Sequence, residues 1–295
     1  MFDVLLNVIA PVLICIVIGY LWGKTPTLYA TDFVTRMVTN IGAPCLIIHT
    51  MNSTDMRWQE FVETAQLTVL TLVCNLALGF VVLRAFRLNF SALSLAVVMP
   101  NVGNMGLSLC LFAFGEDGLA LGLIIFVVTS LVHFASGDIV LAREGSISRR
   151  LLSVTRQPLV YGAAVALLLV TTGWKLPTVL ANTTQLLGGM TIPLMLITLG
   201  VSLSRLGTGN LRIGTIIACT RMLGGLAISC ALVWVFGLTG LLAKVLILQS
   251  AMPSAVFNYL FALKYDRYTD AVASGVVIST FMSMLLIPVL LWFLL

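Results

Sequence analysis

Residues 98–107 read Val-Met-Pro-Asn-Val-Gly-Asn-Met-Gly-Leu and interrupt an otherwise apolar segment of the chain. Pro100 has no N–H to donate to a helical hydrogen bond, and its ring clashes with the preceding turn. Gly103 and Gly106 weaken the helix that follows, because glycine loses the most backbone entropy on folding. This stretch therefore predicts a helix that is broken in its middle.

A second stretch of the chain has the same character. Residues 249–258 read Gln-Ser-Ala-Met-Pro-Ser-Ala-Val-Phe-Asn and repeat the Met-Pro pair, here with Pro253. Backbone groups freed by such a break are tolerated at membrane depth only where they line a cavity or are buried in protein. The two breaks are thus the first candidates for a functional site.

The composition indicates a membrane protein. Of the 295 residues, 60% are hydrophobic and only 9% are charged, whereas roughly a quarter of the residues in a soluble domain are charged. A water-soluble fold is therefore excluded, and the lipid bilayer is the first predicted partner. The net charge of +5 does not indicate nucleic-acid binding, because the basic residues lie at the ends of apolar segments.

Apolar runs separated by charged or Gly/Pro/Asn-rich segments predict an all-α polytopic membrane protein with ten transmembrane helices. Each run is close to the about 20 residues that cross a bilayer core. The predicted spans are 3–22, 34–51, 61–83, 90–114, 118–140, 158–173, 182–203, 213–236, 240–263 and 271–294. The fourth and ninth spans contain the two breaks.

Lysine and arginine residues lie mainly on one side of these spans. Twelve occur in segments on that side, and three, Arg57, Lys175 and Lys244, occur on the other. Because cytoplasmic loops are the ones enriched in Lys and Arg, both termini are predicted to lie outside the cell. The loop 141–157 is then cytoplasmic, and the expected location is the inner (plasma) membrane.

The chain divides into two halves at this loop. Residues 1–140 and 158–295 each hold five predicted spans, and an odd number of spans forces the halves to insert in opposite orientations. Eight of the nine prolines pair between the halves at separations of 147 to 153 residues: 11 with 158, 26 with 177, 44 with 193 and 100 with 253. The sequence therefore predicts two inverted five-helix repeats joined by a cytoplasmic linker.

Inverted repeats with paired broken helices are typical of secondary transporters, in which half-helix N-termini face an anion near the bilayer midplane. Polar side chains at the two breaks can donate to a carboxylate or offer oxygens to a cation. The candidate substrate-binding residues of this kind are Asn101, Asn104, Ser254 and Asn258. The alternative is that these side chains only satisfy the broken backbone.

Arg221 is the basic residue inside the predicted eighth span. It follows the interfacial Arg212 by 9 residues, which at about 1.5 Å per residue places it near the middle of the membrane. A charge at that depth is costly and is usually functional. We expect Arg221 to attract a substrate carboxylate; the alternative is an arginine that caps carbonyl groups at a helix break.

His133 in the fifth span is a further candidate for the substrate site. A proton relay with Asp138 is disfavoured, because residues five apart lie about 140° apart around a helix. The six cysteines have neither Cys-x-x-Cys nor metal-ligand spacing, so no metal site and no cofactor are predicted.

These features resemble those of the auxin efflux carrier family, the bacterial relatives of plant PIN-type auxin carriers in the bile-acid and arsenite transporter superfamily. The resemblance covers the whole chain. It rests on the ten-span length, the breaks at residues 99–106 and 251–255, and the basic residue Arg221 in the eighth span.

The resemblance implies that helices 4 and 9 cross at their breaks. It also implies a transport domain of helices 3–5 and 8–10, which moves like an elevator against a scaffold of helices 1, 2, 6 and 7, and a homodimer formed through the scaffold. The implied substrates are small organic anions, either mono- and dicarboxylates or auxin-like acids. Coupling to H⁺ or Na⁺ is left open.

Two other functions compete with this interpretation. A passive anion channel would use the same broken helices, and only unsaturable flux would distinguish it. An intramembrane aspartyl protease is suggested faintly by Gly137-Asp138 and Tyr265-Asp266. The order of these motifs is reversed and Asp266 lies at a predicted helix end, so we do not expect an enzyme.

The predicted orientation can be tested by cysteine labelling from the cell exterior on a background without native cysteines. Because the basic loops are expected in the cytoplasm, a membrane-impermeant maleimide should label cysteines introduced at 55 and 117 but not at 147. Labelling at 147 in intact cells would contradict both the orientation and the inverted repeat.

Overall fold

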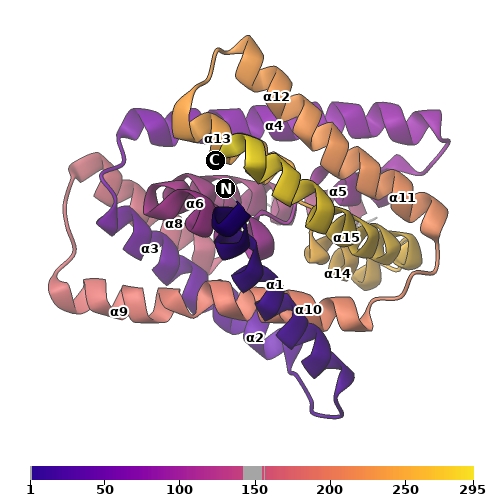
Figure 1. Ribbon diagram of the computed structural model, residues 1–295, viewed down its shortest axis with the longest axis horizontal. Coiled ribbons are helices and arrows are strands. Elements are labelled where there is room, and N and C mark those ends of the chain that lie inside the picture. The colour runs from indigo at the N-terminus through magenta and orange to yellow at the C-terminus, as the bar shows by residue number, and fades with distance from the viewer. Residues whose placement is uncertain (1, 142–154, 156) are drawn as a thin grey trace.

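The computed structural model describes residues 2–141, 155 and 157–295. The regular elements of this part of the chain are all helices, which confirms the predicted all-α class (Figure 1). The first half contains α1 (Phe2–Lys24), α2 (Thr31–Met37), η1 (Val38–Gly42), α3 (Ala43–Ser53), α4 (Trp58–Ala85), α5 (Phe90–Val98), η2 (Val102–Gly106) and α6 (Leu107–Leu141). The elements η1, η2 and η3 are π-helical turns.

The second half begins after the predicted linker 141–157, of which residues 142–154 and 156 lie outside the described part. The side chain of Asp138 is also outside it. The helices of this half are α8 (Pro158–Thr172), α9 (Thr178–Gly189), α10 (Thr191–Arg205), α11 (Leu211–Cys219), η3 (Thr220–Gly224), α12 (Gly225–Val235), α13 (Gly240–Ser250), α14 (Val256–Lys264) and α15 (Thr269–Leu294).

Each predicted span coincides with helical structure. By length and apolar composition, six helical stretches of the described chain could cross a membrane: Asp3–Lys24, Trp58–Ala85, Val102–Ser136, Thr178–Arg205, Leu211–Val235 and Thr269–Leu294. Within α6, Gly115 has φ 72° and ψ −162°, a conformation that is essentially restricted to glycine. This turn falls between the predicted fourth and fifth spans. The count of ten spans stays a prediction.

The helices also contain irregularities that the sequence analysis did not predict. The predicted span 34–51 consists of α2, the π-helical turn η1 and α3, and Pro44 lies just after that turn. A proline removes a helical hydrogen bond and clashes with the carbonyl four residues earlier, which fits a widened turn at this point. The π-helical turn η3 contains Arg221.

The helices pack in two groups. In one group, α1 packs against α10, and α3 packs against α8 and α9. In the other, α4 packs against α5 and α6, α11 against α15, and α12 against α13. Figure 1 shows α9, α10 and α2 along one edge of the molecule and α4, α11 and α12 along the opposite edge. The broken segments lie between these edges.

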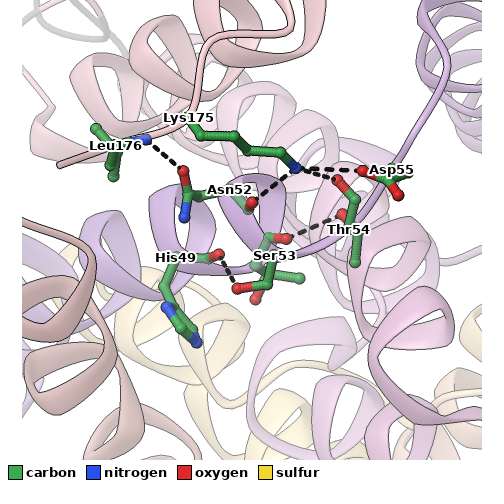
Figure 2. A network of polar contacts seen from close by, with 8 residues as sticks. His49, Asn52, Ser53, Thr54, Asp55, Lys175 and Leu176 are labelled. Carbon is green, nitrogen blue, oxygen red and sulfur yellow. Dashed lines mark hydrogen bonds and ion pairs between the residues drawn. The ribbon is translucent and has the colours of Figure 1, made fainter. Parts of the chain in front are cut away.

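A polar network ties two turns of the first group together (Figure 2). The Nζ of Lys175 donates to the carbonyl oxygen of Asn52 at 2.9 Å and pairs with Asp55 at 3.2 Å. The side-chain oxygen of Asn52 accepts from the backbone N–H of Leu176 at 2.7 Å. The network therefore fixes the α8–α9 turn to the end of α3, although an exposed ion pair adds little to stability.

Two glycines allow α1 and α10 to approach closely. A Cβ atom at Gly200 would clash with the carbonyl oxygen of Ile16, and one at Gly19 would clash with that of Ile197. Membrane helices associate through such small residues, because hydrocarbon lipid supplies no hydrophobic force between helices. Close backbone packing is therefore a main source of stability at this contact.

Replacing Gly200 with alanine should separate α1 from α10 and destabilise the protein by about 1–3 kcal/mol, the usual cost of overpacking. The measurement is the melting temperature in detergent. Gly189 is the matched control, since its added Cβ would meet nothing within 4 Å. Equal melting temperatures for Gly200→Ala and Gly189→Ala would contradict this account of the contact.

Candidate functional site

The two predicted helix breaks meet in the structure. The backbone N–H of Asn101 donates to the carbonyl oxygen of Pro253 at 2.7 Å, and the N–H of Ala255 donates to that of Met99 at 3.1 Å. These bonds join the two broken segments as a short antiparallel pair. This pairing of residues 99–101 with residues 253–255 is here called the crossing. The segment between α5 and η2 therefore satisfies its backbone on the segment between α13 and α14.

Ser254 completes the pairing opposite Pro100. Its side chain is fully buried, and its Oγ donates to the carbonyl oxygen of Ala96 at 2.8 Å. In an unbroken helix that oxygen would accept from the N–H of residue 100, which proline does not have. The backbone N–H of Ser254 donates to Oγ of Ser279 at 3.1 Å. Ser254 thus compensates for the proline across the crossing.

Asn258 also serves the crossing. Its Nδ2 donates to the carbonyl oxygen of Met99 at 3.2 Å and to Oγ of Ser254 at 2.9 Å, and the side chain is buried. Its Oδ1 has no hydrogen-bond partner. Ser254 and Asn258 therefore hold the two broken segments together, and their predicted contact with a substrate stays a prediction.

Arg221 lies on the other side of the crossing. Its side chain has no exposed surface, and it donates from Nη1 to the carbonyl oxygen of Val98 at 2.5 Å and from Nη2 to that of Ser250 at 2.6 Å. Val98 and Ser250 are the last residues of α5 and α13. The guanidinium therefore caps the C-terminal ends of both first half-helices, the arrangement that the alternative interpretation of Arg221 requires.

The second half-helices begin on the opposite side of the break. The continuous helix of η2 and α6 starts at Val102, and α14 starts at Val256. The first N–H groups of a helix have no acceptor within it, and the helix dipole places a partial positive charge at that end. Such an end favours an anion.

A cavity of about 60 Å³, here called the crossing cavity, lies at this position. Asn101 and Val102, at the start of η2, line this cavity, and so does Ala255, which lies directly before α14. Its polar lining includes Thr39, Asn101, Asn104, Thr129, Ser130 and His133. Within the described part of the chain, no Asp, Glu, Lys or Arg residue lines it.

One of these lining residues carries an unused polar atom. The Nδ2 of Asn101 is buried without a hydrogen-bond partner, and only 4% of the residue surface is exposed. The side chain of His133 interacts with that of Asn258. Because a buried polar group without a partner costs free energy, the Asn101 amide is a donor that a polar ligand would satisfy.

Asn104 connects the crossing cavity with a second one. This cavity, of about 50 Å³, is also lined by Asn104 and Phe257. Gly103 lies against the crossing cavity, where a Cβ would come within 2.8 Å of the Phe126 ring. At Gly106 a Cβ would clash with the Gln249 side chain. The predicted break glycines therefore allow close packing around the crossing.

The sequence analysis missed several residues of the cavity wall. Thr129 and Ser130 lie one helical turn before His133 on α6, and this spacing alone could have placed them on its face. The aromatic residues Phe126, Phe134 and Phe257 also line the crossing cavity. Nothing in their sequence context distinguishes them from ordinary apolar residues of a membrane helix.

A larger polar cavity of about 950 Å³ lies between the α3–α4 turn, α6 and the α12–α13 turn. Four carboxylate residues line it, namely Asp55, Glu60, Glu63 and Asp117, against one arginine, Arg57. This excess of negative charge repels anions. The crossing cavity, which has helix N-termini and neutral donors, is the better candidate for binding an anion.

Broken apolar helices that meet beside a cavity are typical of membrane transporters. The chain belongs to the membrane transport protein family, also called the auxin efflux carrier family, whose sequence profile matches residues 4–147 and 146–291. This confirms the family expected from the sequence.

Two archaeal relatives are similar over nearly the whole chain. An uncharacterized transporter of Methanothermobacter thermautotrophicus is 26% identical over 287 residues, which cover 94% of each chain. An uncharacterized transporter of Methanocaldococcus jannaschii is 26% identical over 309 residues, covering 98% of this chain and 99% of the relative. Family membership points to transport and not to catalysis.

The function of the breaks can be tested at Pro100. Alanine at this position supplies an N–H that competes with Ser254 for the carbonyl oxygen of Ala96, so α5 should extend through the break. We expect Pro100→Ala to lose transport at near-normal membrane abundance. Pro288→Ala is the matched control, because Pro288 lies within α15 and outside the crossing. Full transport activity in the Pro100→Ala, Pro253→Ala double variant would show that the breaks are only packing kinks.

Proposed function

We propose that this protein is a secondary transporter of small organic anions, and that the substrate carboxylate binds in the crossing cavity beside Asn101. The observation that carries the proposal is the unpartnered Nδ2 of Asn101 at the start of the η2–α6 helix. An amide donor and free helix N–H groups together suit a carboxylate. Asn104 and His133 complete the proposed site.

The cavity wall favours a monocarboxylate with an apolar body. The aromatic rings of Phe126, Phe134 and Phe257 line the cavity next to the polar groups. A second carboxylate would lie against these rings without a basic partner, and burying an unpaired charge is costly. Among the organic anions expected from the sequence, aromatic or branched monocarboxylates therefore fit better than dicarboxylates.

The position of the cavity supports an alternating-access mechanism. It is lined by Thr39 and Met195 from the group of α1–α3 and α8–α10, and by Asn101 and Phe257 from the group of α4–α6 and α11–α15. A substrate bound between two packed groups can be exposed to either side when one group moves. We assign the first group as the scaffold and the second as the transport domain.

The wider architecture of the proposal comes from the sequence and, for the homodimer, from the family resemblance. This architecture has ten spans in two inverted repeats. Both termini lie outside the plasma membrane, and two copies form a homodimer through the scaffold. The coincidence of every predicted span with helical structure supports the span count. The two segments matched by the family profile meet at residues 146–147, inside the predicted linker, which supports the division into halves.

Counterflow in proteoliposomes tests the proposal. Liposomes that contain the purified protein are loaded with an unlabelled anion, and uptake of the same labelled anion is measured. Benzoate is compared with lactate, malate and malonate. A carrier accumulates label transiently because inward and outward movement share one site, whereas a channel does not. Saturable counterflow of benzoate supports the proposal. Unsaturable flux without counterflow would replace it with the channel, and no flux of any of these anions would contradict it.

Asn101 should contribute directly to affinity. A hydrogen bond to a charged group contributes about 1.5–3 kcal/mol, so Asn101→Ala should raise the apparent KM for benzoate by roughly tenfold to a hundredfold. The matched control is Asn182→Ala, since Asn182 is exposed on α9. An unchanged KM in Asn101→Ala, with transport otherwise intact, would remove Asn101 from the site.

A further inference from the structure

Arg221 is a charged residue with no acidic partner among the described residues. The ion pairs in this part of the chain join Arg57 to Glu60 and Lys175 to Asp55. The guanidinium instead contacts two backbone carbonyl oxygens, those of Val98 and Ser250. An isolated charge is strongly disfavoured in a membrane interior. The hydrogen bonds to these two carbonyl oxygens therefore stabilise the charge of the guanidinium.

Both carbonyl groups belong to helix C-termini. The C-terminal end of a helix carries a partial charge of roughly −0.5, so two ends that converge on one point call for about one positive charge. One guanidinium supplies that charge. A bound Na⁺ ion would meet the same requirement, because hard cations are bound by carbonyl oxygens.

We propose that Arg221 is a built-in counter-cation that replaces a bound metal cation at the crossing, so that transport requires no Na⁺. It acts as a positioning residue: by holding α5 and α13 together at their C-terminal ends, it fixes the N-terminal ends that face the anion. This inference rests on the proposed function and deepens it, since it addresses the coupling ion that the sequence left open.

The surroundings of Arg221 support a positioning role over a direct contact with substrate. Its side chain lines a separate cavity of about 20 Å³, and Pro100 lies on the walls of both this cavity and the crossing cavity. The broken segment thus lies between the guanidinium and the proposed anion site. The smaller cavity has room for about one water molecule.

That small cavity also does not suit a metal cation. Arg221 forms part of its wall, and the positive charge of this residue repels a second cation. The Nε of Arg221 and the Oε1 of Gln249 are buried without partners. A water molecule can accept from the first and donate to the second, whereas a cation can use only the second.

Gly225 makes the arrangement sterically possible. A Cβ at this position would clash with Nη2 of Arg221 and with the carbonyl oxygen of Ser250. Gly225→Ala therefore displaces the guanidinium while leaving its charge in the chain. This variant therefore tests whether the position of the guanidinium matters, because the charge itself is still present.

The test combines benzoate counterflow with thermal melting in detergent. Wild-type counterflow should be equal within about twofold when Na⁺ is replaced by K⁺ or choline. Arg221→Ala should lose at least about tenfold in rate and melt at a lower temperature, because the two carbonyl groups lose their shared partner. Millimolar guanidinium chloride should restore part of both quantities by occupying the vacated space. Arg221→Lys should retain an intermediate rate, since Lys offers a point charge without the fork.

Two further variants make the test specific. Gly225→Ala should lose rate and melting temperature without rescue by guanidinium, because the space is not vacated. Arg212→Ala is the matched control, since it removes an exposed arginine from α11, the helix that leads directly into η3. It should behave like wild type in both measurements.

Three results would overturn the proposal. Wild-type counterflow that stops in choline would show that a bound Na⁺ is required. A raised KM in Arg221→Ala with an unchanged melting temperature would make Arg221 a direct substrate ligand. Wild-type behaviour of Arg221→Ala would leave it without a role. If the wild type transports none of the anions, the proposed function fails, yet the melting temperatures and their rescue still test the bracing by Arg221.

Discussion

Backbone polar groups without partners determine how this protein is built. In a hydrocarbon environment each unsatisfied N–H or C=O group costs several kcal/mol, so two helices cannot break in the middle unless other parts of the chain satisfy the freed groups. Here the two breaks satisfy each other through the Asn101–Pro253 and Ala255–Met99 hydrogen bonds. Ser254 supplies the donor that proline lacks. The crossing thus depends on both breaks being present, which explains why Pro100 and Pro253 occur as a pair.

The two sides of the crossing differ in charge and in how far their polar groups are paired. On the side where the first half-helices end, the chain supplies its own cation: Nη1 and Nη2 of Arg221 donate to the carbonyl oxygens of Val98 and Ser250, and Nε has no partner. On the side where the second half-helices begin, the Asn101 amide and a small cavity remain available. A protein that neutralises its carbonyl ends and leaves its amide ends open is suited to an anion. This asymmetry links the packing of the crossing to the proposed substrate class.

Much of this arrangement could be predicted from the sequence, because it follows from residue types with strict backbone consequences. Proline and glycine located the breaks, and apolar runs located the helices. The sequence could not determine which way Arg221 points, since its depth in the membrane is the same whether it contacts a substrate or two carbonyl groups. Nor could it identify Phe126 and Phe257 as cavity residues. The sequence pattern around an aromatic residue in a membrane helix is the same whether the side chain faces lipid or a cavity. Those choices are made by tertiary packing.

The central claim is that the N-terminal side of the crossing, and not Arg221, receives the anion. A crystal structure with 4-bromobenzoate tests it most directly, because anomalous scattering from bromine locates the ligand and its orientation. The account predicts the carboxylate within hydrogen-bond distance of Asn101 Nδ2 and the start of η2, with the bromine toward the Phe126 and Phe257 rings and Arg221 still on its two carbonyl groups. A carboxylate bound to the Arg221 guanidinium, with the bonds to Val98 and Ser250 broken, would contradict it.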